Sequence, residues 1–151
     1  RGHLYKQAQL LGCNKIALGH HYDDVIETTM LSLLYGGEFK TMMPKLHSRN
    51  FEGMELIRPF YLVREEQVKS FVARYGIPVM TCACRVTKLE DGGKRKQVKQ
   101  LIKDMKKTIP LVESSIFSSA QKVSLGAVLG WRKRDEGPFT SFLDVYGQDE
   151  G

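Results

Sequence analysis

The sequence predicts an α/β fold in which a parallel sheet is covered by helices, and two observations support that prediction. Residues 2–11 have the apolar spacing of a helix, residues 15–19 form a short apolar strand pattern, and residues 24–35 are again helical. This alternation is typical of parallel sheets, whose strands are connected through helices. With 151 residues and 42% hydrophobic content, the chain has the size of one ordinary domain with a modest core.

The first helix and strand follow from simple spacing. Leu4, Ala8 and Leu11 recur three or four residues apart, as on one helical face, and Gly12 is a natural stop. The apolar run at residues 15–19 then predicts a short buried strand. In the next helix, Ile26, Met30, Leu31 and Leu34 share one face, and two glycines after Tyr35 end it.

Downstream, the patterns become shorter. Residues 45–48 and 54–59 predict two strands of a hairpin around a polar turn. An amphipathic helix is expected over residues 65–75, stopped by Gly76, and an extended segment follows at residues 77–80. In this helix the apolar side chains expected to face inward are Val68, Phe71 and Val72.

The last third of the chain predicts two more helices and a tail. Residues 94–107 and 110–123 have helical patterns, the first with an apolar face at Val98, Leu101, Ile102 and Met105. Residues 132–151 are polar, contain glycine and lack periodicity, so we expect a loose tail there.

Composition narrows the class of protein. Lysine and arginine exceed aspartate and glutamate by six, which makes a polyanionic partner plausible without identifying one. Three cysteines are too few for a disulfide scaffold and indicate reduced thiols. No apolar run reaches the roughly 20 residues of a membrane helix, so we expect a soluble cytoplasmic protein. Because the chain opens at Arg1 inside a helical pattern, we expect it to begin within a larger reading frame.

A polar turn after the first predicted strand holds the residues best suited to chemistry: His20, His21, Tyr22, Asp23 and Asp24. In open α/β sheets, ligands bind beyond the carboxyl ends of the strands, where loops lead into helices. Backbone N–H groups at a helix start favour phosphate, and adjacent carboxylates can hold Mg²⁺. The turn therefore predicts a phosphate and magnesium site with Asp23 and Asp24 as its catalytic carboxylates.

A structural interpretation of the same turn competes with this one. Asp24 and Glu27 have the spacing of a capping box, which by itself needs no catalysis. That account leaves His20, His21 and Asp23 unexplained, so we favour a functional site in which Glu27 is mainly structural. A zinc site made of these three residues is disfavoured, because neighbouring side chains in a loop diverge.

Several segments, taken together and in order, resemble one enzyme family. They are RGHLYKQAQLLGCNKIALGHHYDDVIETTMLSLLYGG, MMPKL, ELIRPFYLVREEQV and IPVMTCAC. Over roughly residues 1–123 the chain resembles the tRNA 2-thiocytidine synthetase family of PP-loop ATPases. The GHHxDDxxET string is shared with the related lysidine synthetases, whereas the RGxLY, MPKL and IRP segments and the late cysteine are more specific.

This resemblance implies a Rossmann-like PP-loop domain of the adenine nucleotide alpha hydrolase type. Its ATP-gripping Ser-Gly-Gly-x-Asp-Ser loop would lie upstream and is not found in this sequence. We expect residues 1–83 to be the C-terminal part of that domain, incomplete at its N-terminus. A basic helical extension over residues 84–124 and a flexible tail over residues 125–151 would follow.

Site residues are carried over by the same match. His20, Asp23 and Asp24 fall on the ATP and magnesium side of the site. Lys45 and Arg58 fall on family motifs, where they either neutralise phosphate or RNA or form surface ion pairs.

The resemblance also implies a [4Fe-4S] cluster held by two cysteines of an upstream CxxC pair and one later cysteine. Cys82 matches the later ligand. The family commonly shows CxxC here, whereas this chain has Cys82-Ala83-Cys84, so Cys84 is either a spare thiol or an alternative ligand. Three protein ligands leave one iron open to an exogenous sulfur. Cys13 matches no family cysteine, and we expect it to pack as a small hydrophobe.

A basic stripe is predicted on the helix after Cys84. Lys96, Lys99 and Lys103 recur at helical spacing, continued by Lys106 or Lys107. Lysine-rich helix faces are usually only solvated, but such a stripe can also follow an RNA backbone. The substrate of the family favours RNA.

The function implied is ATP-dependent tRNA thiolation: adenylation of a cytidine C2 oxygen and then sulfur transfer. The chain by itself would be an inactive part of that enzyme, with tRNA and a sulfur donor such as a cysteine desulfurase as partners. Alternatives are another tRNA-modifying PP-loop ATPase, a thiouridine or lysidine synthetase, or a non-catalytic RNA-binding fragment. An incomplete sheet would expose an edge that favours association, such as a homodimer.

Overall fold

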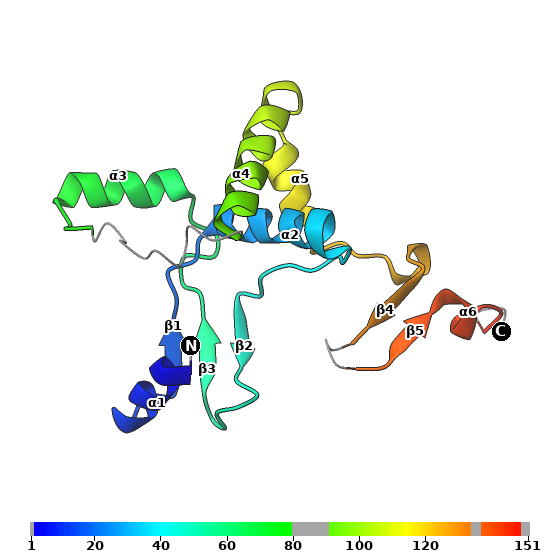
Figure 1. Cartoon of the computed structure of the whole chain (residues 1–151), viewed down its shortest axis with the longest axis horizontal. Coiled ribbons are helices and arrows are strands. Elements are labelled where there is room, and N and C mark those ends of the chain that lie inside the picture. The colour runs from blue at the N-terminus through cyan, green and yellow to red at the C-terminus, as the bar shows by residue number, and fades with distance from the viewer. Residues whose placement is uncertain (1, 80–90, 134–136, 149–151) are drawn as a thin grey trace. The chain divides into compact units, whose positions relative to one another are not determined.

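The computed structural model describes residues 2–79, 91–133 and 137–148. The chain forms two compact units, Arg1–Ala120 and Gln121–Gly151. The larger unit contains a small sheet and five helices among its described residues, and the smaller contains a hairpin with short helical segments (Figure 1). None of the described helices has the length and apolar content that crossing a membrane requires.

The sheet of the larger unit has three short strands in the order β1-β3-β2. Strand β1 (Lys15–Ala17) pairs in parallel with β3 (Glu55–Ile57), and β2 (Lys45–His47) pairs with β3 in antiparallel fashion. Both the parallel α/β arrangement and the predicted hairpin are confirmed. Gly53 supports the hairpin turn, because its φ of 72° lies in the left-handed region that favours glycine.

The predicted burial of β1 was wrong. Its residues are exposed or half-buried, whereas Leu56 on the central strand β3 is buried. Strand β1 lies at one edge of the described sheet, and the described helix packed against it is α1 (Gly2–Leu10). An edge strand with one helical neighbour keeps much of its surface in water.

The main core of the larger unit lies between three helices. Helix α2 (Tyr22–Gly36) packs against α4 (Asp91–Thr108) and α5 (Val112–Ser119), which lie side by side above it in Figure 1. The buried centre consists of Ile26, Val98 and Ile102, surrounded by the half-buried Tyr22, Met30, Leu31, Ile116 and Phe117. The apolar face predicted for α4 is thus only partly used, because Leu101 is exposed.

Helix α3 (Glu65–Tyr75) has the predicted bounds and ends at Gly76, whose φ of 60° is left-handed. Its predicted inward face holds only in part, because Val68 and Val72 are half-buried. No α3 residue is buried, and Phe71 is 57% exposed. The helix extends away from the sheet in Figure 1, so its apolar stripe has little to pack against in the described part of the chain. Residues 77–79 follow without forming a strand.

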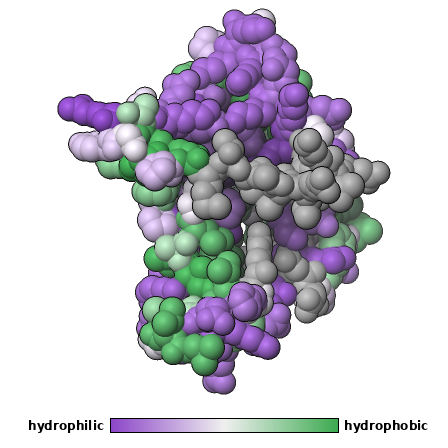
Figure 2. Space-filling view, turned by 60° about the vertical axis from the view of Figure 1, so that its left-hand side comes forward, coloured by the Kyte–Doolittle hydropathy of each residue, from purple (hydrophilic) through white to green (hydrophobic). Residues whose placement is uncertain are grey.

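On the face that Figure 2 shows, polar and apolar side chains gather in different regions. Figure 2 shows mainly hydrophilic side chains over the region of α4, at the top of the view, and apolar side chains lower down, over the region of α1 and the sheet. The exposed apolar residues there include Leu4, Leu10, Leu11 and Leu46.

The smaller unit has more regular structure than its sequence indicates. After the short helical turn η2 (Leu125–Ala127), strands β4 (Gly130–Arg132) and β5 (Phe139–Ser141) pair in antiparallel fashion, and α6 (Phe142–Val145) follows. The sequence after residue 132 does not reveal β5 and α6, because elements of three or four residues are too short to show periodicity. The Phe139 ring lies against Gly130 where a side chain would otherwise project.

Candidate functional site

The site begins where two parallel strands end. Because β1 and β3 run in the same direction, the loops that follow them leave the same edge of the sheet. Two backbone hydrogen bonds hold these loops together: Leu18 N–H to Ile57 O and Tyr22 N–H to Val63 O, each 2.9 Å long. The start of α2 is thereby placed beside the start of α3.

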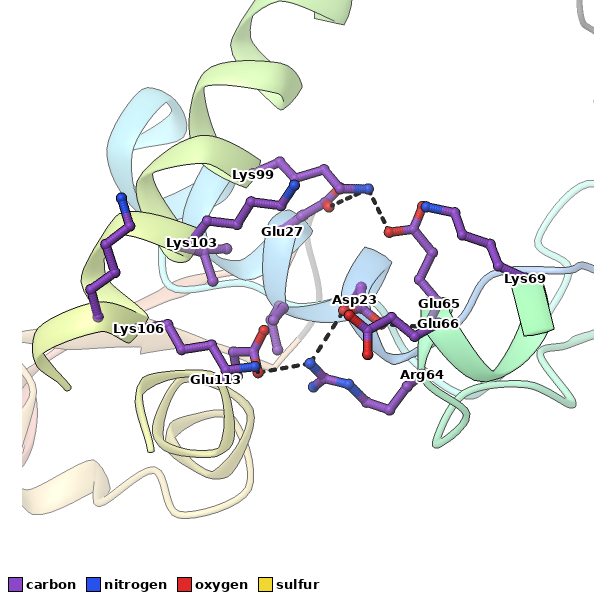
Figure 3. A pocket seen from close by; sticks show the side chains of 13 residues that line it. Asp23, Glu27, Arg64, Glu65, Glu66, Lys69, Lys99, Lys103, Lys106 and Glu113 are labelled. Carbon is purple, nitrogen blue, oxygen red and sulfur yellow. Dashed lines mark hydrogen bonds and ion pairs between the residues drawn. The ribbon is translucent and has the colours of Figure 1, made fainter. Parts of the chain in front are cut away.

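A pocket of about 430 Å³ lies between α2, α3, α4 and α5 (Figure 3). Its walls combine carboxylates and basic side chains with two apolar residues. They are Asp23, Ile26, Glu27, Arg64, Glu65, Glu66, Lys69, Lys99, Ile102, Lys103, Lys106, Lys107 and Glu113. The mixture of charges suits a ligand that itself combines cationic and anionic groups, such as a magnesium–phosphate complex.

Asp23 is the predicted site residue that reaches this pocket from α2. Its side chain is 17% exposed, and its Oδ2 accepts a 2.7 Å hydrogen bond from the Glu65 backbone N–H at the start of α3. Its Oδ1 lies 3.4 Å from Nη2 of Arg64. One carboxylate oxygen is therefore anchored by main chain, and the other faces a guanidinium.

Arg64 connects this carboxylate to α5. Its Nη2 also donates to Oε2 of Glu113 at 2.7 Å, and its guanidinium lies 4.7 Å from the centre of the Tyr22 ring. Partial burial opposes the ionisation of Glu113, but hydrogen bonds from Lys106 and Arg64 outweigh it and hold the Glu113 pKa below its usual value. A chain of alternating charges thus runs from Asp23 through Arg64 and Glu113 to Lys106.

A second group of ion pairs forms the opposite wall. Glu27 is 5% exposed and lies 2.9 Å from Nη1 of Arg95, while Lys99 Nζ lies 2.6 Å from Oε2 of Glu65. Burial raises the pKa of Glu27, although Lys99 and Arg95 oppose this. The hydrogen bond from Lys99 lowers the pKa of Glu65 to about 2. Both carboxylates tie α4 to its neighbours.

Asp24 has a structural position, and the capping box differs from the predicted one. Helix α2 is capped by His21, whose Nδ1 accepts from the Asp24 N–H at 3.4 Å, while Asp24 Oδ2 accepts from the His21 N–H at 3.0 Å. Asp24 Oδ1 also lies 3.3 Å from Arg95. The box therefore starts three residues earlier than predicted, which leaves Glu27 inside the helix and facing α4.

The structure brings Asp23, Lys99 and Lys103 together at the pocket. It places the other described candidates, His20, Asp24, Lys45, Arg58 and Lys96, outside the lining.

His20 is half-buried between β1 and α2, Lys45 is exposed on β2, and Lys96 is exposed on α4. Arg58 is only 8% exposed, and its Nη1 donates to the backbone carbonyl of Met43, so it connects the loop before β2 to the loop after β3.

The structure describes only one of the three cysteines for which a role was predicted. Cys82 and Cys84, the predicted cluster ligands, lie outside the described residues. Cys13 was expected to pack in the interior, but it is exposed. It follows the exposed residues Leu11 and Gly12 in the loop between α1 and β1, where no core is available.

The carboxylates of the pocket suit Mg²⁺ that is bound together with a nucleotide. Among the described residues no cluster of three or more histidine, cysteine or acidic side chains could hold a metal by itself. Mg²⁺ bound with a nucleotide usually needs only one or two carboxylates, since water and phosphate complete its shell. Asp23 fits this role better than Asp24, because Asp23 lines the pocket whereas Asp24 lies outside the lining.

Sequence reasoning missed Arg64, Glu65 and Glu113. The first two were detectable, because they follow the strand pattern at residues 54–59 just as the polar turn follows the first strand. Once these two strands are taken to be parallel neighbours, their following loops must meet. No sequence pattern points to Glu113 as a pocket residue, because its position depends on how α5 packs.

Comparison with known proteins identifies the family. The sequence pattern of the PP-loop domain matches residues 3–82, which is more than half of the chain. The chain belongs to the PP-loop domain family. Within this PP-loop region lie the polar turn, both parallel strands and Arg64.

Curated relatives extend the match beyond the PP-loop region. The tRNA-cytidine(32) 2-sulfurtransferase of Pelobacter propionicus is 39% identical over 123 residues, covering 82% of this chain and 45% of the relative. The enzyme of the same name from Anaeromyxobacter dehalogenans is 36% identical over 149 residues, covering 99% of this chain and 49% of the relative. The chain therefore spans about half the length of these relatives.

A solved structure has a similar fold. The U34-tRNA thiolase NcsA from Methanococcus maripaludis, determined with its [4Fe-4S] cluster, superposes with a TM-score of 0.61. The match covers 80% of this chain and 39% of the thiolase, at 20% sequence identity. It supports the α/β architecture described above.

Proposed function

We propose that the chain is the C-terminal part of an ATP-dependent tRNA sulfurtransferase that converts a cytidine to 2-thiocytidine. The observation that supports this most is the 39% identity to a tRNA-cytidine(32) 2-sulfurtransferase over 123 residues, which continues well beyond the PP-loop match at residues 3–82. The same relatives favour tRNA as the substrate. The remainder of the protein would supply the main ATP loop.

The proposed reaction has two steps. The C2 oxygen of the cytidine attacks the α-phosphorus of ATP, and pyrophosphate leaves. A sulfur nucleophile then adds to C2, and the C–O bond breaks as AMP departs with that oxygen. Protein groups assist by neutralising the phosphates and by holding a base that has left its stack.

Asp23 is the proposed magnesium ligand of this reaction. Its Oδ2 is held by the Glu65 N–H, whereas its Oδ1 has only the longer 3.4 Å contact with Arg64, so a cation that replaced Arg64 at Oδ1 would leave the helix starts undisturbed. His20 would contact the nucleotide from the preceding loop. Asp24 would act by fixing the start of α2 through its cap, although it was first predicted to bind the metal directly.

The basic residues divide into two groups. Lys99 is paired with Glu65 and would mainly support the pocket wall, whereas Lys96 and Lys103 have no ion pair with any residue that the structure describes. We assign RNA phosphate contacts to Lys96 and Lys103. Lys45 is exposed and available for the same role, while the main-chain contact of Arg58 favours a structural one.

A [4Fe-4S] cluster bound by Cys82, or by Cys84 in its place, together with two cysteines of the remaining protein would hold and deliver the sulfur. A sulfur donor such as a cysteine desulfurase would reload it. The exposed apolar residues of α1 and the sheet are consistent with association in a homodimer. We expect the enzyme to work in the cytoplasm, where tRNA is found.

The test uses the full-length protein that contains this chain, purified and reconstituted without oxygen. It is incubated with ATP, Mg²⁺, tRNA and sulfide, and the digested nucleosides are identified by mass spectrometry. We expect 2-thiocytidine from the wild type and at least about a 10-fold lower rate from Asp23→Asn, which keeps the side-chain shape but loses the charge. Lys15→Gln, which removes a distant ion pair with Glu55, is the matched control.

Two outcomes would contradict the proposal. Formation of thiouridine or lysidine would assign the chain to another tRNA-modifying PP-loop enzyme. Absence of both ATP binding and any modified nucleoside, in a protein with an intact cluster, would favour a non-catalytic RNA-binding role.

A further inference from the structure

Arg64 is shared unequally between two carboxylates. The same atom, Nη2, lies 2.7 Å from Glu113 Oε2 and 3.4 Å from Asp23 Oδ1. Figure 3 shows the guanidinium between these two side chains, with dashed lines to both. The shorter contact is to Glu113, so the contact to Asp23 is the weaker of the two.

The geometry makes Arg64 and a metal ion compete for one oxygen. Asp23 Oδ2 accepts a 2.7 Å hydrogen bond from the Glu65 N–H, whereas Oδ1 has the longer 3.4 Å contact with Arg64, so Oδ1 is the oxygen for which a cation would compete. A divalent cation on Oδ1 would repel the guanidinium beside it. Glu113 offers the arginine another partner already within hydrogen-bond distance.

Two contacts keep the arginine near both partners. Its guanidinium lies over the Tyr22 ring, 4.7 Å from the ring centre, and the Tyr22 hydroxyl donates to the Glu113 carbonyl at 3.2 Å. Tyr22 directly precedes Asp23 at the start of α2. A small shift of the guanidinium toward Glu113 therefore needs no movement of a helix.

We propose that Arg64 is a positioning residue: it stabilises Asp23 in the absence of a divalent cation, and Glu113 draws it away when Mg²⁺ binds with ATP. Together the two residues set the magnesium affinity of Asp23. This inference rests on the proposed function only in taking Mg²⁺ and ATP as the ligands of the pocket.

The test measures metal binding directly. Full-length protein is titrated with Mn²⁺ in the presence of a non-hydrolysable ATP analogue, and free Mn²⁺ is followed by electron paramagnetic resonance. Glu113→Gln leaves Arg64 to Asp23 alone, so the half-saturating Mn²⁺ concentration should rise about 3- to 10-fold. Arg64→Gln removes the competing charge and should lower it by a similar factor.

The double variant separates this role from a direct one. If Glu113 acts through Arg64, adding Glu113→Gln to Arg64→Gln changes nothing further. An equal effect of Glu113→Gln in both backgrounds would mean that Glu113 binds the metal itself, and would overturn the inference. So would unchanged or increased half-saturating Mn²⁺ in Arg64→Gln. Lys15→Gln should match the wild type.

The outcome is distinguishable from failure of the proposed reaction. A protein that binds Mn²⁺ with the predicted shifts but forms no 2-thiocytidine would retain the Arg64 role and lose the reaction. If the protein forms 2-thiocytidine but Mn²⁺ binding is unshifted in these variants, the proposed reaction stands and the role of Arg64 is wrong.

Discussion

Among the described carboxylates, Glu65 has a strongly lowered pKa. Lys99 lies 2.6 Å from one of its oxygens and Lys69 lies 3.0 Å from the other, and the hydrogen bond from Lys99 is the main reason that its pKa falls to about 2. Its side chain is 23% exposed, so solvent screens the pairs only in part. A group of this kind makes the stability of the fold depend on pH.

The sign follows from the lowered pKa. Because the folded-state pKa of Glu65 lies below the ordinary value of 4.5, its contribution is present above pH 4.5 and is lost as the pH falls towards 2. Glu65→Gln should therefore lower the free energy of unfolding by about 1–2 kcal/mol at neutral pH, after allowance for screening. That difference should shrink towards zero between pH 4.5 and 2.

Denaturant unfolding of the wild type and the variant at several pH values measures this difference. Asp104→Asn, which removes an exposed partner of Lys107, is the control and should have a smaller effect. A Glu65→Gln difference that does not change with pH would contradict the role assigned to the Lys99 pair.

At the scale of elements, the contact of α4 with α2 depends on very few buried side chains. Ile102 is 4% exposed and packs with Ile26 and Val98, whereas its neighbour Leu101 is 41% exposed. Ile102→Ala should lower the free energy of unfolding by about 2–4 kcal/mol, because it opens a cavity in this cluster. Leu101→Ala should cost less than about 1 kcal/mol, and equal effects would place the core elsewhere.

The start of α2 gives a second prediction at this scale. Asp24→Ala removes the acceptor of the His21 N–H and a partner of Arg95, so it should cost about 1 kcal/mol of stability. Hydrogen exchange of the His21 amide should become faster in this variant. Glu27→Ala should leave the exchange of the Asp24 amide unchanged, because that N–H donates to His21 Nδ1. A faster exchange of the Asp24 amide in Glu27→Ala would instead support a capping box between Asp24 and Glu27.

At the scale of the whole molecule, binding of tRNA should depend on which lysines are already paired. Lys103 has no ion pair with a described residue, whereas Lys107 lies 2.6 Å from Asp104. Lys103→Gln in the full-length protein should weaken tRNA binding and reduce the slope of log affinity against log salt by about one. Lys107→Gln should change the slope less, because a phosphate must first displace its carboxylate.

Fluorescence anisotropy with labelled tRNA over a range of salt concentrations measures both slopes. If the two variants had equal slopes, pairing within the protein would not determine which lysines bind RNA. An unchanged slope for Lys103→Gln would remove this lysine from the RNA contact altogether.

Much of the architecture could be predicted because it depends on local patterns. Glycines with left-handed backbones ended the predicted helices at Tyr35 and Tyr75, and the turn at Gly53 separated the two hairpin strands. Burial was harder, because it depends on neighbours. The amphipathic pattern of α3 could not reveal that Phe71 faces solvent.

The site was predictable in part for the same reason. Asp23 followed from its place after a strand, but its partners Arg64 and Glu65 come from a segment about 40 positions along the chain, and Glu113, which binds Arg64, lies farther still. The lysine spacing on α4 was seen correctly. Which of those lysines are already paired depends on where Glu65 and Glu113 are placed by the fold.

The parallel pairing of β1 with β3 has a consequence for exchanging segments between related proteins. A one-residue slip in this pairing would move the loop after β3 by about 3.3 Å and turn the strand over, separating Arg64 from Asp23. A chimera joined between Ile57 and Glu65 would take the β1–β3 register from one parent and Arg64 from the other, so the two need not match. Transplanting residues 45–75 as one piece keeps the hairpin, the arginine and the start of α3 from the same parent.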